Sequence, residues 1–237
     1  MSRIFKSEGI IFKSLKYSET SLILDIYTKE IGIQSFIVSG VRKSKSKFSN
    51  IFQPMNIIDL VAYRSENKLS RIKENGLAVS YSNLNSHVVL STLGMFIIDL
   101  SRNVIKEREV NLELYNFIRS QLLKLDSNPD KLNLMPIQYA LSLASFLGFE
   151  ITNNFTLDAK YFDLISGRFV DNNVANALIM NENLSYKLHQ LLSQNNTAAL
   201  DKDERNLLLD KVLKFYELHM EGFKPLKSLP VLRTILS

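Results

Sequence analysis

The 237-residue chain contains no cysteine, and this absence excludes several kinds of protein chemistry together. Disulfide frameworks, thiolate nucleophiles and cysteine-ligated zinc or iron–sulfur sites all require that residue. The sequence also lacks an uninterrupted run of roughly 18 apolar residues, the length that signals a membrane span. Its first residues show no apolar signal-peptide core. The composition therefore predicts a cytoplasmic protein that is not bound to a membrane.

Glycine and histidine are scarce as well. There are only 8 glycines, in neither a GxxxxGK[ST] nor a GxGxxG arrangement, so the phosphate-binding loops of ATPases and dinucleotide enzymes are missing. The three histidines, His87, His189 and His219, lie on separate segments without metal-ligand spacing. The acidic cluster at 201–204 is explained by favourable placement of carboxylates at the start of a helix. We therefore predict no catalytic site, no cofactor and no metal, and do not expect an enzyme.

The net charge of +5 is modest, but the positive charge is unevenly distributed. Residues 1–80 hold 13 Lys and Arg against 7 Asp and Glu, while the remaining 157 residues hold 16 against 17. A basic segment beside a neutral one favours a polyanionic partner for the first and protein partners for the second. A Lys-rich surface that only aids solubility is the alternative, and the count alone does not decide between them.

Five short segments in the first third are rich in β-branched and aromatic residues and are separated by polar or glycine-containing turns. They are predicted as strands at residues 8–17, 21–28, 33–39, 55–63 and 69–74. Closely spaced short strands favour a small closed barrel, because closure removes exposed strand edges. An OB-fold and an SH3-like barrel both fit this pattern.

From residue 86 the spacing of apolar residues changes to the period of an α-helix. Ser86 is the expected N-cap of a helix to residue 104, and Gly94 within it would let another backbone approach closely. Further helices are predicted at 111–125, 135–146, 173–180, 185–194 and 201–221, with a β-hairpin at 161–170. The chain is therefore predicted as an α+β protein with a barrel domain at 1–80 and a helical domain at 81–237, the latter interrupted by a non-helical hairpin segment at 150–172.

Two basic loops are the strongest candidates for a binding site. The loop after the third strand carries Arg42, Lys43, Lys45 and Lys47, spaced by serines, and the next carries Arg64, Lys68, Arg71 and Lys73. Lys13 and Lys16 would extend this patch, and Tyr17 is a candidate for stacking on a base. Such groups neutralise phosphates and favour single strands over a defined duplex sequence. Phe48 and Phe52 could also stack on bases, but packing into the barrel is the favoured prediction for both.

Several stretches in order resemble a known family. They are Glu8 to Ile11, Lys16 to Leu24, Tyr27 to Gly32, Ser39 to Ser46 and Phe52 to Pro54, then more weakly Leu147 to Phe149, Phe162 to Leu164, Gly167 to Phe169 and Pro225 to Ser228. In this order and spacing, over most of the chain, they resemble the RecO family of bacterial recombination mediators. The resemblance implies a five-stranded OB-fold barrel followed by a helical domain.

The resemblance also implies a function without enzymatic turnover. Members of the family bind and anneal single-stranded DNA, bind duplex DNA as well, and help to load RecA onto strands coated by single-strand-binding protein. The implied partners are RecR, the acidic C-terminal tail of single-strand-binding protein and, indirectly, RecA, at the nucleoid in the cytoplasm. The alternatives are an adaptor whose basic barrel binds an acidic protein segment, or binding of RNA.

One departure from the family concerns the region around 150–172. Many members carry a four-cysteine zinc site there, and a chain without cysteine cannot form it. We expect an apolar cluster in its place, formed by Phe155, Tyr161, Phe162, Phe169 and Val170. The basic tail with Lys224, Lys227 and Arg233 could bind an acidic tail, although a helix-end or solubility role explains it equally well.

Overall fold

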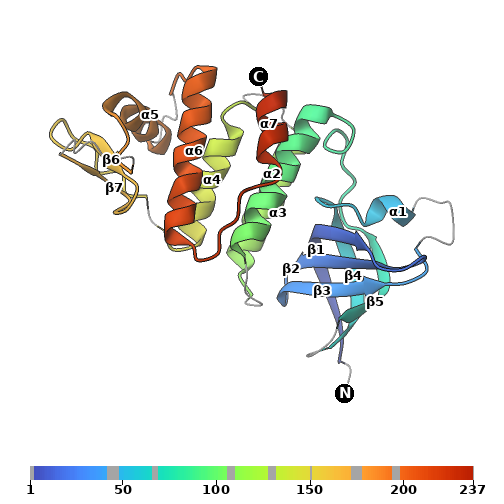
Figure 1. Cartoon of the computed structure of the whole chain (residues 1–237). Helices are drawn as coiled ribbons and strands as arrows, with labels where there is room; N and C mark the ends of the chain where they lie inside the picture. The colour runs from blue at the N-terminus through green and yellow to red at the C-terminus, as the bar shows by residue number, and fades with distance from the viewer. Residues whose placement is uncertain are drawn as a thin grey trace. The chain divides into compact units, whose positions relative to one another are not determined.

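The structure is a computed structural model that describes residues 3–41, 48–65, 69–105, 110–127, 132–149, 151–171, 178–193 and 198–236. The chain forms two compact units, Met1–Pro129 and Asp130–Ser237 (Figure 1). The first unit holds a barrel together with the helices that follow it directly. The boundary between the two compact units lies after residue 129. The change from strands to helices lies earlier, near residue 80, within the first unit.

The predicted five-stranded, OB-like barrel is confirmed. Its strands are β1 (Arg3–Lys16), β2 (Leu22–Thr28), β3 (Gly32–Val38), β4 (Ile57–Arg64) and β5 (Ser70–Leu77). They close in the order β1-β2-β3-β5-β4. β1 is longer than the predicted segment because its first half pairs with β4 and its second half with β2. Closure between β3 and β5 rests on two parallel pairs, Phe36 with Ser70 and Ile37 with Arg71.

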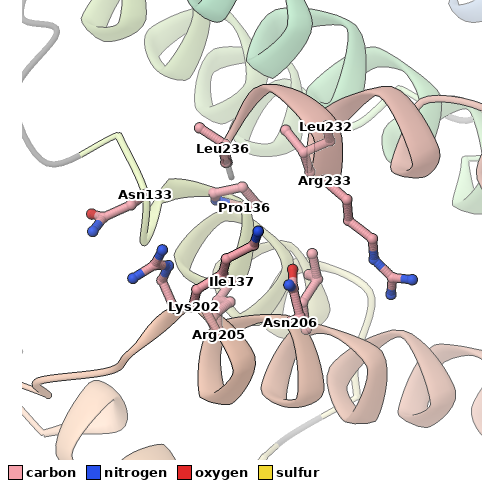
Figure 2. Close-up of a pocket in the computed structure, with 10 residues that line it drawn as sticks. Asn133, Pro136, Ile137, Lys202, Arg205, Asn206, Leu232, Arg233 and Leu236 are labelled. Atoms are coloured by element: carbon pink, nitrogen blue, oxygen red, sulfur yellow. The ribbon is translucent and has the colours of Figure 1, made fainter.

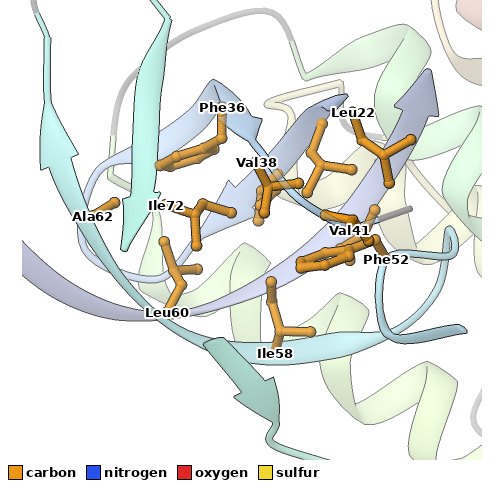
Figure 3. Close-up of a cluster of buried hydrophobic side chains, with 12 residues drawn as sticks. Leu22, Phe36, Val38, Val41, Phe52, Ile58, Leu60, Ala62 and Ile72 are labelled. Carbon is orange, nitrogen blue, oxygen red and sulfur yellow. The ribbon is translucent and has the colours of Figure 1, made fainter. Parts of the chain in front are cut away.

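Alternate residues of the strands fill the barrel interior (Figure 3). Leu24, Ile26 and Phe36 are fully buried there. Phe52, which follows the short helix α1 (Phe48–Ile51), is 2% exposed and belongs to the same core. The prediction that Phe52 packs into the barrel is therefore confirmed. The side chain of Phe48 lies outside the described residues.

Two long helices complete the first unit. α2 (Val88–Val104) starts after His87, not after the predicted cap Ser86, because the Ser86 hydroxyl donates to the Asn83 carbonyl in the preceding turn. α3 (Leu112–Ser127) starts where the side chain of Asn111 accepts a hydrogen bond from the Leu114 amide at 2.9 Å. The cap at Asn111 supplies one of the acceptors that a helix N-terminus needs.

These helices cover one end of the barrel's outer surface. Tyr27 of β2 faces outward, lies 5.8 Å from the ring of Tyr115 on α3, and is 1% exposed. Glu8 on β1 accepts from the Tyr115 hydroxyl at 3.0 Å and from Arg119 Nε at 2.8 Å. The buried ring pair and the charged hydrogen bonds together hold α3 against β1 and β2.

The second unit contains α4 (Met135–Phe146), β6 (Tyr161–Asp163), β7 (Arg168–Val170), α5 (Glu182–Leu192), α6 (Lys202–His219) and α7 (Leu229–Ile235). The Tyr216 hydroxyl of α6 donates to the Ala140 carbonyl of α4 at 2.6 Å. At the start of α6, Asp201 and Glu204 form a reciprocal capping box, which agrees with the predicted role of the acidic cluster. The predicted hairpin is confirmed.

Two predictions for this unit need correction. Of the helix expected at 173–180, residues 173–177 lie outside the described residues, and 178–180 are not helical. Their backbone pairs with the hairpin instead, since the Met180 amide donates to the Phe162 carbonyl at 2.8 Å. The tail, where no helix was predicted, forms α7. Pro230 lies in its first turn, where a missing N–H costs nothing.

Candidate nucleic-acid interface

The outer surface of the barrel is open at the end that α2 and α3 leave uncovered. Cross-strand partners on this face point to the same side. A continuous outward row therefore follows from the strand register: Leu15 beside Ile23, Ile23 beside Ile37, Ile37 beside Arg71, Arg71 beside Tyr63, and Tyr63 beside Ile4. The row crosses every strand of the closed barrel and returns to β1, so it passes round the barrel, and we call these six outward-facing residues the open face. Ile4 is 56% and Leu15 45% exposed, whereas Ile23, Ile37 and Tyr63 are half-buried, so the largely apolar row is partly in contact with solvent.

Predicted site residues lie on and around the open face. Arg71 is part of it, and Lys13 lies beside it on the same side of β1. Lys16 is exposed at the end of β1, and Arg64 is exposed at the end of β4. The open face therefore has cations at both margins, the arrangement expected where phosphates flank stacked bases.

Tyr17 follows the last residue of β1 and is 63% exposed. Its backbone amide donates to the Ser21 carbonyl at 3.1 Å, which fixes the turn that presents the ring. An exposed ring on a fixed turn can stack on an unpaired base without first leaving the core. The structure thus keeps Tyr17 available for the predicted role.

Lys73 differs from the other cations. It occupies an irregularity in the β4–β5 register, and its Nζ lies 3.1 Å from the carboxylate of Glu74. This hydrogen bond raises the pKa of Lys73. Because both side chains are well exposed, the pair is weak, but it leaves less net positive charge here than at Arg71.

Five of the predicted cations lie outside the described residues: Arg42, Lys43, Lys45 and Lys47 in the first loop, and Lys68 in the second. The structure describes the residues at the ends of the first loop. Gly40 has a φ of 81°, and the buried Val41 donates its amide to the Thr20 carbonyl at 3.1 Å. The loop therefore leaves β3 beside the turn that carries Tyr17.

Sequence reasoning missed the apolar members of the open face. Leu15, Ile23 and Ile37 are apolar residues among apolar neighbours, so nothing in the sequence separates the outward from the inward ones. The signal that identifies them is the register, in which each faces away from a core residue. That register is set by turns and by a β-bulge between Ile11 and Lys13, which shifts the parity of β1.

The second unit has a small pocket between α4, α6 and α7 (Figure 2). Its apolar lining residues include Pro136, Ile137 and Leu232, and its charged lining residues are Lys202, Arg205 and Arg233. Arg205 donates to the Leu200 carbonyl at 3.0 Å, and Arg233 pairs with Asp210. Apolar lining residues beside three cations suit a ligand that carries both a carboxylate and an apolar group. Of the basic tail singled out in the sequence, Arg233 lines this pocket, while Lys224 and Lys227 do not.

The hairpin segment contains an aromatic cluster. Phe155 packs edge-on against Phe169 at 5.4 Å and stacks on His189 at 4.5 Å, and Phe162 packs against Phe169 at 5.1 Å. The predicted apolar cluster is confirmed for these three phenylalanines, while Tyr161 and Val170 are half-buried. His189 also belongs to this aromatic cluster and was not predicted from the sequence. Within the described parts of the chain, no three His, Asp or Glu residues are grouped closely enough to bind a metal.

No helix within the described ranges combines the length and the apolar character needed to cross a membrane.

Comparison with known proteins connects this architecture to one family. Residues 1–81 match a family model described as Recombination protein O N terminal. Similarity to individual proteins extends over both units. The protein of Christiangramia forsetii named DNA repair protein RecO is 32% identical over 239 residues, covering 98% of this chain and 99% of the relative. Proteins of the same name from Flavobacterium johnsoniae and Phocaeicola vulgatus are 32% and 28% identical, with the same shares covered.

Proposed function

The chain belongs to the RecO family of DNA repair proteins, so its role lies in DNA repair and recombination, and from this premise we propose that it binds single-stranded DNA on the open face of its barrel. The observation that carries the proposal is the outward row from Leu15 to Ile4, which is largely apolar, partly exposed and bordered by cations. Bases stack on apolar and aromatic groups, while phosphates bind Lys and Arg. The loop cations Arg42, Lys43, Lys45 and Lys47 extend the proposed site.

We further propose that the protein anneals complementary strands and helps to load RecA onto strands coated by single-strand-binding protein, acting with RecR at the nucleoid. None of these steps needs a catalytic group, and the protein acts without enzymatic turnover. Support for a contact with the acidic tail of single-strand-binding protein comes from the pocket with Lys202, Arg205 and Arg233 beside apolar lining residues. Its cations would bind the tail's carboxylates, and its apolar lining residues would take an apolar side chain.

Binding of labelled single-stranded DNA, duplex DNA and RNA, measured by fluorescence anisotropy across a range of salt concentrations, tests the first part. Single-stranded DNA should bind tightest. Replacing Arg42, Lys43, Lys45 and Lys47 together with Gln should flatten the salt dependence by about 0.7 for each phosphate that is no longer neutralised. An unchanged slope would remove the loop from the site. Preference for RNA, or displacement of the oligonucleotide by an acidic peptide, would favour one of the two alternative functions.

Tyr17 gives a sharper test of stacking. Tyr17→Ala should weaken binding by about 1–3 kcal/mol if the ring stacks on one base, and Tyr17→Phe should keep most of the affinity. Tyr186→Ala is the matched control, because Tyr186 is also a substantially exposed tyrosine but lies on α5 in the second unit. Equal effects of Tyr17→Ala and Tyr186→Ala would contradict a specific role for Tyr17.

The tail contact is tested with a labelled peptide of the single-strand-binding protein C-terminus. Lys202→Gln combined with Arg205→Gln should weaken peptide binding, whereas Lys224→Gln combined with Lys227→Gln should not, because these two lysines do not line the pocket. The reverse result would move the contact from the pocket to the basic tail.

A further inference from the structure

Arg102, in the last turn of α2, reaches the surface of the barrel. Its Nη2 atom lies 3.7 Å from Oδ2 of Asp25 on β2, and its side chain is 39% exposed. The other carboxylate oxygen of Asp25 accepts a hydrogen bond from the Ser35 hydroxyl at 2.8 Å. Asp25 is therefore held firmly by its neighbour on β3, while its contact with Arg102 is longer than a hydrogen bond.

Asp25 marks the margin of the open face. Along β2 it lies between Ile23, which belongs to the open face, and Tyr27, which α3 covers. In the β1–β2 register its partner is Lys13, so Lys13 and Asp25 point to the same side. Arg102 thus contacts the Asp25 carboxylate while Lys13 stands opposite Asp25 on the neighbouring strand, and positive charge is in excess at this margin.

The loose contact leaves Arg102 with capacity for another ligand. A guanidinium has five N–H donors, and a single oxygen at 3.7 Å fully satisfies none of them. Arginine binds phosphate through pairs of parallel hydrogen bonds, which makes it well suited to a nucleic-acid backbone. A phosphate beside the open face would offer the close acceptors that Asp25 does not.

We propose that Arg102 is a phosphate-binding residue of the DNA interface, contributed by α2 from outside the barrel strands, and that the Asp25 carboxylate competes with phosphate for its guanidinium at the margin of the open face. This inference rests on the proposed single-stranded DNA binding. It extends the interface onto a helix that follows the five-stranded barrel in the sequence. The competing explanation is that Arg102 only anchors α2 to β2 through the ion pair.

Two variants separate these explanations, because the ion pair is removed in both while the guanidinium is removed in only one. Arg102→Gln should weaken single-stranded DNA binding and lower the salt slope by about 0.7, the value for one neutralised phosphate. Asp25→Asn keeps a side chain that can accept from Ser35 and removes the carboxylate that competes with phosphate. It should strengthen binding without lowering the slope. Lys29→Gln, at the far end of β2 from the open face, is the charge-matched control and should leave the slope unchanged.

Thermal unfolding of each variant accompanies the binding measurements. If Arg102 only anchors the helix, both variants should lower the midpoint of thermal unfolding by the same amount. Both should also bind with the same salt slope as the wild-type protein, and that result would overturn the inference. Weaker binding by Asp25→Asn would overturn it as well. These outcomes differ from failure of the proposed function, in which the wild-type protein itself would not bind single-stranded DNA.

Discussion

Met55 and Gly94 lie so close that a Cβ atom at Gly94 would stand 2.5 Å from Sδ of Met55. Leu84 would be the next neighbour, with Cδ1 at 3.2 Å. Met55 is fixed on both sides of its own backbone, since its amide donates to the Ile11 carbonyl and its carbonyl accepts from the Tyr81 hydroxyl. Gly94 thus allows a close approach, as the sequence predicted, but a side chain and not a backbone fills the space.

Gly94→Ala is expected to destabilise the protein by about 1 kcal/mol in urea unfolding, because overpacking costs about 1–3 kcal/mol and a gain of about 1 kcal/mol in helix propensity offsets part of it. In a Met55→Ala background the clash is largely removed, so the same substitution should be neutral or stabilising. An equal effect of Gly94→Ala in both backgrounds would show that the contact with Met55 is not the cause.

Asp126, near the end of α3, accepts hydrogen bonds from the backbone amides of Ser82, Asn83 and Leu84 at 2.7–3.0 Å. Burial would raise the pKa of Asp126, but the three donors outweigh it and lower the pKa below its ordinary value. These hydrogen bonds therefore stabilise the fold fully above the unfolded-state pKa of about 3.9, and this contribution disappears as the pH falls through the lower native pKa.

Asp126→Asn should accordingly cost about 1 kcal/mol at neutral pH, because the amide nitrogen of Asn cannot accept the hydrogen bond that Ser82 donates to Oδ2. The difference from the wild-type protein should shrink as the pH falls below about 4. Thermal unfolding from neutral to acidic pH measures this, with Asp158→Asn, on an exposed turn of the second unit, as the control. A stability difference that does not change with pH would contradict the assignment.

Four tyrosines should resist ionisation in the folded protein. Burial raises the pKa of Tyr27 to about 12 and raises the pKa values of Tyr81, Tyr115 and Tyr216 as well. Because the native values lie above the unfolded value of about 10, their contribution to stability is complete below that pH and is lost as the pH rises through the native values. The tyrosinate absorbance of these four residues should therefore appear only together with the loss of circular dichroism. Full tyrosinate absorbance in the folded protein would contradict the prediction.

Metal removal should leave the protein unchanged. The chain has no cysteine, and the hairpin segment packs around Phe155, Phe162 and Phe169. We expect no stoichiometric zinc by elemental analysis and the same unfolding midpoint with and without a chelator. Phe155→Ala should instead destabilise by about 2 kcal/mol, less than for a fully buried ring. A chelator effect of comparable size would favour a metal over the aromatic cluster.

The fold was largely predictable because the spacing of apolar residues in its strands and helices follows the period of each kind of element. α4 was predicted at its observed bounds, since its apolar stripe ends shortly before Gly148. The prediction of a helix over 178–180 was wrong because the backbone of this segment pairs with the hairpin instead of forming helical hydrogen bonds. The spacing of apolar residues in the sequence does not reveal such a pairing. α7 was missed because Pro230 suggests a break, although proline is well accommodated in a first turn.

The candidate site was predictable only in part. Charge density along the chain identified the basic loops and Arg71, and the solvent-exposed Tyr17 fits its predicted role. The apolar open face could not be predicted, because it depends on which residues stand opposite one another across the strand pairs of the barrel. The contact between Asp25 and Arg102 joins residues from two elements far apart in the sequence, and neither stands out in composition.

The two residue pairs that join β3 to β5 make the barrel's closure unequal around its circumference. β5 is held along its length by β4, whereas most of its other edge has no partner among the described strands. Residues 36 and 70 are far apart in the sequence, so this junction closes a long loop and carries a larger entropic cost than the hairpin between β2 and β3. Closure of the barrel therefore depends most on the short junction between β3 and β5, and local opening there would separate Arg71 from Ile37 and divide the open face at its middle.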